Sequence, residues 1–238
     1  GALLQGRRAP SATLYIVITS DKGLAGALNS AVLRMAAGVI KPGDAVVAIG
    51  RKAQDFFVNR GVPVLKYHPS SDVIDAAQID TILGKVAEQF LSAKFDAVRI
   101  VYQNFISTFE QRPTMHTIFP LQLAELRKVV EGIVPAKGAY AQANKGFSGD
   151  APVMYTIEPN EESVLDVILP KLASVFVYHA LIESQASEHS ARMVAMKSAS
   201  DKAAEMTHSL TLKFNKARQA AITREVSEII GGMEAIAN

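Results

Sequence analysis

The sequence predicts an α/β protein: a Rossmann-like domain with a mostly parallel central sheet, followed by a very long C-terminal helix that forms half of a coiled coil. Three observations predict this fold. Short apolar runs alternate with helical stretches over the first half of the chain. After Pro170 there is no further proline and, before Gly231, no glycine. An apolar repeat of seven residues runs along this second region. The predicted domains are 1–160, with a mobile loop at 122–152, and the long helix at 161–238.

The first strand is expected at 13–20, where TLYIVITS is continuously apolar and β-branched, as in a strand buried on both faces. DAVVAIG repeats this pattern, and Gly61 is placed to close the helix that follows it. A later helix is indicated by one apolar face, made of Ile79, Ile82, Leu83, Val86 and Phe90. The expected strands are 13–20, 44–50, 62–68, 96–105 and 115–121, and the expected helices between them are 27–40, 51–61 and 75–95. VMYTIEP (153–159) is expected to form a short strand before the long helix.

The long helix would extend about 90 Å from Lys171 to Ile230 at about 1.5 Å per residue. A step of seven residues selects two rows of side chains, which together form a thin stripe: Val175, Ile182, His189, Met196, Ala203, Leu210 and Ala217, with His179, Ala186, Met193, Ser200, Thr207, Phe214 and Ala221. Small and polar residues are common in this stripe, so it suits one close partner helix and not a globular core. The sequence contains no second helix of comparable length. The partner is therefore expected in another chain or in a segment upstream of Gly1.

Composition excludes several kinds of site. Cysteine is absent, which removes disulfides, thiolate metal sites and thiol nucleophiles. The net charge of +2 and the low aromatic content disfavour a nucleic-acid binder. No apolar run approaches the roughly 20 residues that span a bilayer, so no direct membrane insertion is expected. The histidines lack metal spacing, and no catalytic arrangement can be placed. We therefore expect no catalytic residue, no metal and no cofactor.

The segment DKGLAG (21–26) lies between a strand and a helix, where phosphate-binding loops occur. It matches neither the P-loop pattern nor the dinucleotide-binding pattern, which favours a structural turn. Asp21 and Lys22 could still bind a ligand at this edge of the sheet.

Near the C-terminus, NKARQAAITREV carries a dense polar cluster. Its members are Arg218, Gln219, Thr223, Arg224 and Glu225. Such a cluster is often only a solvated helix end. Ala220 and Ala221 nevertheless keep this helix thin, and the guanidinium of Arg218 suits carboxylates or carbonyls of a partner.

The chain resembles the gamma subunits of rotary F-type ATP synthases over nearly its whole length. The resemblance rests on TSDKGLAGALNS near the first strand, and on ALIESQASEHSARMVAMKSASDKA and LTLKFNKARQAAITREVSEIIGG in the long helix. Family members also have an N-terminal helix that pairs with the C-terminal one. The resemblance therefore implies an antiparallel coiled coil, of which this sequence is expected to contain only the C-terminal half.

The resemblance implies a non-catalytic rotor shaft that couples proton flow to ATP synthesis or hydrolysis. Its implied partners are the surrounding alpha and beta subunits, the epsilon subunit and the c-ring, together with an N-terminal gamma helix outside this chain. The α/β domain would be the foot of the shaft. Beta-subunit contacts carry over to Arg218, Gln219, Thr223 and Glu225, and proximity to the c-ring or epsilon to Tyr155 and Glu158. The expected location is peripheral, on the cytoplasmic face of a bacterial plasma membrane, or on the mitochondrial matrix side if the protein is organellar.

The alternative is an α/β nucleotide- or small-ligand-binding protein with a helical dimerisation arm. Its distinguishing property would be specific binding of ATP, ADP or NAD by the isolated chain.

Overall fold

A computed structural model describes residues 12–70, 76–120 and 161–237 of the chain. The elements are, in order, β1 (Thr13–Ile18), α1 (Leu28–Ala37), β2 (Ala45–Ile49), α2 (Arg51–Val58), β3 (Val64–His68), α3 (Ala76–Leu91), β4 (Ala97–Ser107), β5 (Glu110–Phe119) and α5 (Glu161–Ala237). The chain divides into two compact units, Gly1–Arg192 and Met193–Asn238, so the division falls within α5. The boundary at residue 160, drawn from the sequence, stays a prediction.

The five strands form one sheet in the order β3-β2-β1-β4-β5. β1 pairs in parallel with both β2 and β4, and β2 pairs in parallel with β3. The chain first builds strands outward from β1 and then returns through α3 to place β4 on the other side of β1. The mostly parallel sheet predicted from the alternation of strands and helices is therefore confirmed.

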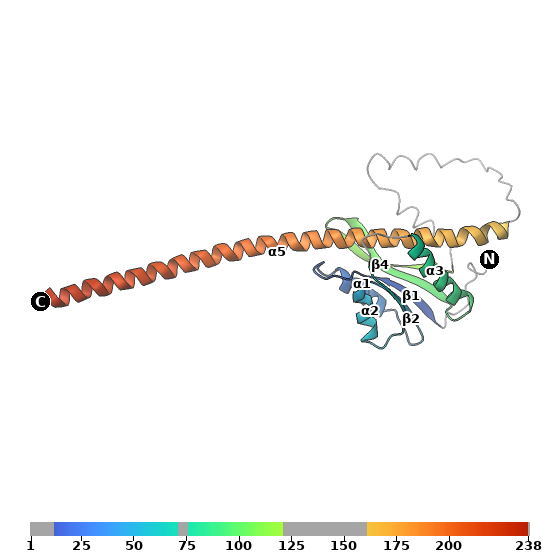
Figure 1. Cartoon of the computed structure of the whole chain (residues 1–238), viewed down its shortest axis with the longest axis horizontal. Coiled ribbons are helices and arrows are strands. Elements are labelled where there is room, and N and C mark those ends of the chain that lie inside the picture. The colour runs from blue at the N-terminus through green and yellow to red at the C-terminus, as the bar shows by residue number, and fades with distance from the viewer. Residues whose placement is uncertain (1–11, 71–75, 121–160, 238) are drawn as a thin grey trace, which may run out of the picture. The chain divides into compact units, whose positions relative to one another are not determined.

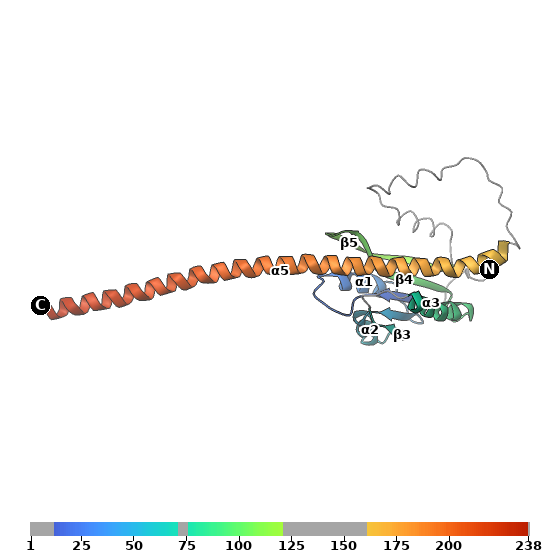
Figure 2. The same ribbon diagram turned by 45° about the horizontal axis from the view of Figure 1, so that its top comes forward.

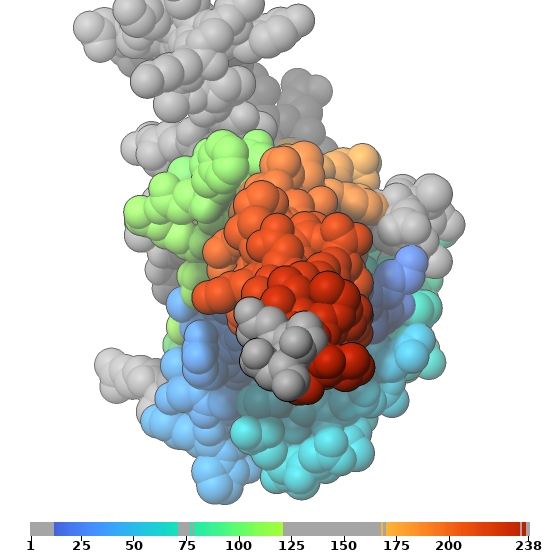
Figure 3. Space-filling view, turned by 90° about the vertical axis from the view of Figure 1, so that its left-hand side faces the viewer, coloured from blue at the N-terminus to red at the C-terminus, as the bar shows by residue number. Residues whose placement is uncertain are grey.

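The fifth strand is longer than the sequence pattern indicated. It begins at Glu110, five residues before the predicted start, and pairs antiparallel with β4 to form a hairpin. Polar residues and Pro113 weaken the strand signal in EQRPTM. Proline is tolerated because β5 lies at the end of the sheet, where one backbone edge needs no strand partner. Near the turn of this hairpin, drawn in green in Figure 3, Phe109 is 85% exposed.

Helices cover both faces of the sheet, as alternation of side chains along each strand requires. α1 and α2 cover the face that carries Tyr15, Val17 and Val46. α3 and the first part of α5 cover the opposite face, which carries Leu14 and Ile16. Figures 1 and 2 show these helices on the two sides of the strands. The apolar face predicted for α3 is buried in full.

One face of α5 before Met193 belongs to the core of the first unit. Ala173, Phe176, Val177 and Ala180 are buried against the sheet, at spacings of three and four residues that place them on one helix face. Beyond them, two serines of α5 bind the backbone of Gln103 in β4: Ser184 Oγ accepts from its N–H at 3.3 Å, and Ser187 Oγ donates to its carbonyl at 3.3 Å. The base of the long helix is therefore anchored by apolar packing and by hydrogen bonds.

The second unit consists of α5 beyond Arg192. The helix is unbroken between Leu181 and Ile230, as the absence of proline and glycine predicted, and it also continues through Pro170. Every residue from Met196 to Met233 is exposed. The large apolar side chains among them are Met196, Met206, Leu210, Leu212, Phe214, Ile222, Val226, Ile229, Ile230 and Met233. Within the described part of this unit, no residue is buried in a core.

Candidate functional site

The loop that follows β1 binds the start of α2. Gly50 precedes α2 and has no side chain with which to cap the helix. Asp21 of this loop supplies a cap in its place, because its Oδ1 accepts from the N–H of Arg51 at 2.7 Å. Its Oδ2 accepts from the N–H of Ser70 at 3.1 Å, and Thr19 Oγ1 accepts from the N–H of Ala53 at 2.9 Å. Both oxygens of Asp21 thus have structural partners, which agrees with the structural-turn interpretation of DKGLAG.

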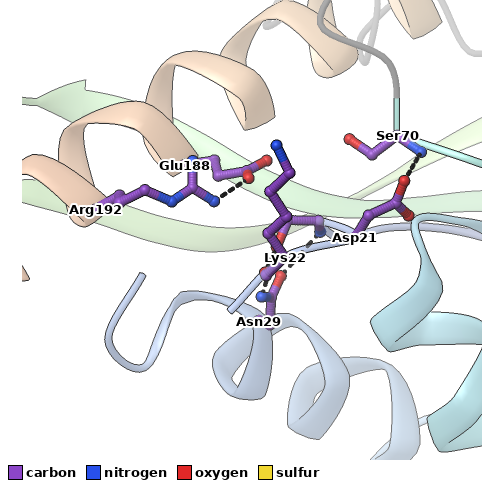
Figure 4. A network of polar contacts seen from close by, with 7 residues as sticks. Asp21, Lys22, Asn29, Ser70, Glu188 and Arg192 are labelled. Atoms are coloured by element: carbon purple, nitrogen blue, oxygen red, sulfur yellow. Dashed lines mark hydrogen bonds and ion pairs between the residues drawn. The ribbon is translucent and has the colours of Figure 1, made fainter. Parts of the chain in front are cut away.

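The same loop is tied to α1. Asn29 Oδ1 accepts from the N–H of Ser20 at 3.0 Å, and Asn29 Nδ2 donates to Ser20 Oγ at 2.7 Å. Opposite Lys22, α5 carries an ion pair between Glu188 and Arg192, whose side chains are largely shielded from water (Figure 4). The end of β1 is therefore organised by hydrogen bonds within the fold.

A doubly wound sheet binds ligands where the strand order reverses, here beyond the carboxyl ends of β1 and β4. The cavity at this point has a volume of only about 50 Å³. Its lining includes Leu181, Ser184, Gln185 and Glu188 of α5, so the long helix occupies the position that a ligand would take. This volume holds a few water molecules, whereas small-molecule sites need roughly 300–1,000 Å³. A nucleotide does not fit here, which counts against the alternative function at this position.

Glu183 of α5, which was not among the residues predicted from the sequence, is a half-buried acid that faces the β4–β5 hairpin. Its carboxyl group faces Tyr102 of β4 and lies near His116 of β5, and its Oε1 is 3.8 Å from Nδ1 of His179. Burial raises the pKa of Glu183, and the two histidines and the hydroxyl of Tyr102 oppose that rise. Its Oε2 has no hydrogen-bond partner among the described residues. No sequence motif marks this cluster, because its members come from three separate elements.

Replacing Glu183 by glutamine is expected to raise the free energy of unfolding at pH 7 by about 1 kcal/mol, since the variant buries no charge. The folded-state pKa of Glu183 is raised, so the natural chain gains stability as the pH falls through that pKa, and the gain is complete below the unfolded value of about 4.5. The difference between variant and parent should therefore shrink as the pH falls from 7 to 4.5.

Urea unfolding at several pH values measures this difference, with the exposed Glu228→Gln as the control. A difference that grows toward low pH would contradict the prediction.

The C-terminal polar cluster lies on the exposed part of α5. Arg218, Gln219, Thr223 and Glu225 are all exposed, and none has a hydrogen bond or ion pair within the described part of the chain. Helical geometry gives two polar edges, one through Arg218 and Glu225 and one through Gln219 and Thr223. The structure thus leaves the cluster free to contact another molecule. Tyr155 and Glu158 lie outside the described residues.

Sequence comparison identifies the family. A family model described as ATP synthase matches residues 2–236. The ATP synthase gamma chain of Symbiobacterium thermophilum is 40% identical over 226 residues, which cover 93% of this chain and 72% of that relative. The gamma chain of Chloroflexus aurantiacus is 38% identical over 248 residues, which cover 99% of this chain and 77% of that relative. The chain belongs to the ATP synthase gamma family.

Solved structures agree with this family in fold. A chain of the Euglena gracilis mitochondrial ATP synthase, in a structure of its OSCP, F1 and c-ring, superposes with a TM-score of 0.66 at 22% identity, covering 99% of this chain and 78% of that one. A chain from the central stalk and c-ring of the Tetrahymena thermophila mitochondrial enzyme gives 0.60 at 23% identity, covering 82% and 80%. Gamma-family membership therefore rests on the sequence matches, and these structures share its sheet-and-long-helix fold.

None of the helices formed by the described residues has the length and apolar character needed to cross a membrane. No group of three or more His, Asp or Glu side chains in residues 12–70, 76–120 and 161–237 is arranged to hold a metal ion.

Proposed function

We propose that this chain is the central rotor shaft of an F-type ATP synthase, and that it couples proton flow through the membrane sector to ATP synthesis or hydrolysis in a surrounding ring of alpha and beta subunits. One observation carries the proposal: a helical stretch of about 55 Å, from Met196 to Met233, has every residue exposed and carries large apolar side chains. Apolar surface on this scale marks an interaction site. In the gamma family, a shaft inside a ring of subunits accounts for it.

The shaft acts by differential binding. At each shaft angle its asymmetric surface stabilises one conformation of each surrounding subunit, so rotation shifts their conformational equilibria in turn. Such a mechanism needs no reacting group in the shaft itself. The anchored base of α5 suits this role, because torque applied to the α/β unit must pass into the helix through the packing of Val177 and its neighbours.

We also propose that a second, antiparallel helix from outside the described part of the chain covers the stripe that repeats every seven residues along α5. Val175 and Ile182 of this stripe are exposed although they lie beside the buried face of α5. Leu210 and Phe214 continue the exposed stripe in the second unit. An N-terminal gamma helix is the proposed occupant, and the resulting pair would be a coiled coil.

The proposal assigns further partners by position. The polar edges around Arg218 would contact beta-subunit loops, and Tyr155 and Glu158 would lie near the c-ring or the epsilon subunit. The protein would be peripheral on the membrane, on the cytoplasmic face in a bacterium or the matrix face in a mitochondrion.

Replacing Arg218 by alanine in the reconstituted complex is expected to lower coupled ATP synthesis or hydrolysis several-fold and to leave assembly intact. A charge-assisted hydrogen bond contributes about 1.5–3 kcal/mol, which can bias shaft angles without locking them. Arg218→Lys should recover only part of the activity, because an ammonium lacks the planar donor fork. Turnover and proton pumping in reconstituted vesicles measure both effects.

Lys41→Ala is the control, since it removes the same charge from an exposed residue of the α/β unit. Unchanged coupling in Arg218→Ala, Gln219→Ala and Glu225→Ala would mean that the cluster is only a solvated helix end.

In the same complex, a photo-crosslinker at Tyr155 should label the c-ring or epsilon. Labelling of alpha or beta alone would refute the placement of that segment.

A further inference from the structure

A second cavity, of about 340 Å³, lies between α3 and the edge of the sheet at β3, away from the switch point (Figure 2 labels both elements). Its inner wall is apolar and comes from residues buried in the core, among them Leu14, Val47 and Val86. Its volume falls within the range of ligand sites, unlike that of the cavity under α5. We call it the β3 groove.

The rim of the β3 groove is basic. Lys66 of β3, Lys85 of α3 and Lys94 of the following loop come from three separate segments, and Glu88 is the one acidic lining residue. All three lysines are exposed, and none is paired with a carboxylate within the described part of the chain. Burial, followed by the charges of Lys66 and Lys85, lowers the pKa of His68 in the same lining. The groove therefore presents an excess of positive charge beside an apolar wall.

Gln89 also lines the groove. Its Oε1 is buried and has no hydrogen-bond partner among the residues that the structure describes. A donor on a bound molecule could reach this oxygen only after the Gln89 side chain turns toward the groove, so the inference rests on the apolar wall and the basic rim.

We infer that the β3 groove binds an extended segment of a partner protein in which acidic and aliphatic side chains alternate. Aliphatic side chains would lie against Val47 and Val86, and carboxylates would face Lys66, Lys85 and Lys94. β3 is an end strand of the sheet, where an extended segment can lie alongside. The lining contains no Phe, Tyr or Trp on which a nucleic-acid base could stack. This inference is independent of the contacts proposed for Arg218.

The test uses a fluorescent, capped peptide of four Glu-Val repeats and the full 238-residue chain. Saturable binding, measured by anisotropy at low salt, is expected to weaken at least tenfold in a Lys66→Glu/Lys85→Glu variant. The matched control, Lys41→Glu/Lys52→Glu, makes the same change of net charge at exposed lysines that do not line the groove. A peptide of Glu-Ser repeats should bind at least tenfold more weakly than the Glu-Val peptide, since it cannot use the apolar wall.

Carbodiimide crosslinking followed by mass spectrometry locates the peptide, and the crosslinks are expected at Lys66, Lys85 or Lys94. Equal weakening in the two double variants would overturn the inference, because it would show attraction to net charge alone. Absence of saturable binding, equal binding of the Glu-Ser peptide, or crosslinks spread over other lysines would each overturn it as well. None of these outcomes bears on rotary coupling, so failure here leaves the proposed shaft function standing.

Discussion

Replacing Val177 by aspartate is expected to destabilise the α/β unit by about 3–5 kcal/mol, because the new carboxylate would be buried without a partner. Val177 is fully buried between α5 and the sheet, in the same cluster as Leu14 and Ile100. The variant has two ways to relieve this cost: it can unfold, or it can release the base of α5 from the sheet. Urea unfolding should show a lower midpoint, and limited proteolysis should show new cleavage of α5 before Met193.

Val175→Asp is the matched control. It makes the same change two residues away, at a side chain that is 56% exposed, and should alter stability by no more than about 0.5 kcal/mol in this chain alone. Equal destabilisation by the two variants would show that α5 is not anchored through the face that carries Val177. In a complete rotor, Val175→Asp should become harmful as well if a partner helix covers the stripe.

Replacing Gly50 by alanine is expected to lower the free energy of unfolding by at least about 3 kcal/mol, or to prevent folding. Gly50 joins β2 to α2 with a φ of 92°, and a Cβ at this position would lie 2.1 Å from the backbone oxygen of Thr19. The backbone of Thr19 cannot move away easily, because Thr19 is hydrogen-bonded to both β2 and α2. Its N–H donates to the carbonyl of Ile49 at 2.8 Å, and its Oγ1 accepts from the N–H of Ala53 at 2.9 Å. Thermal or urea unfolding measures the loss.

Gly61→Ala separates the cost of the positive φ from the cost of the steric overlap with Thr19. Gly61 also has a positive φ, of 69°, but a Cβ there would meet nothing within 4 Å. Its replacement should cost only the backbone term of about 1–2 kcal/mol. A loss at Gly50 no larger than that at Gly61 would mean that close approach to Thr19 is unimportant. The sequence placed the end of this helix at Gly61, whereas α2 ends at Val58 and its C-cap is Asn59. Gly61 lies in the turn that follows, where its φ is positive and the N–H of Val62 donates to the carbonyl of Phe57 at 3.0 Å.

The sequence predicted those parts of the fold that depend on local pattern. Buried parallel strands are apolar along their whole length, so β1 and β2 were recognisable without any knowledge of their neighbours. The start of β5 was missed because an edge strand may be polar and may contain Pro113. Its pairing with β4, and not its composition, makes it a strand.

The candidate sites also differ in whether the local sequence reveals them or only the folded structure does. The polar cluster around Arg218 was visible in the sequence because all its members lie within two turns of one helix, and that helix is long and uninterrupted. Glu183 was not visible, since its environment is made by Tyr102 and His116 from two other strands. The role of Asp21 also depended on the fold, because its partners Arg51 and Ser70 lie about 30 and 50 residues away.

The sequence by itself determined the fold class, the gamma family and the unbroken helix, because apolar periodicity, helix-breaking residues and long matching segments are properties of the chain read in order. Only the tertiary structure decided which face of α5 is buried and which is free. Along this helix small and apolar residues occur on several faces, so periodicity alone selected the stripe through Val175 and not the face through Val177. The choice depends on which side chains fill the space over β1 and β4, and that space exists only once the sheet has formed.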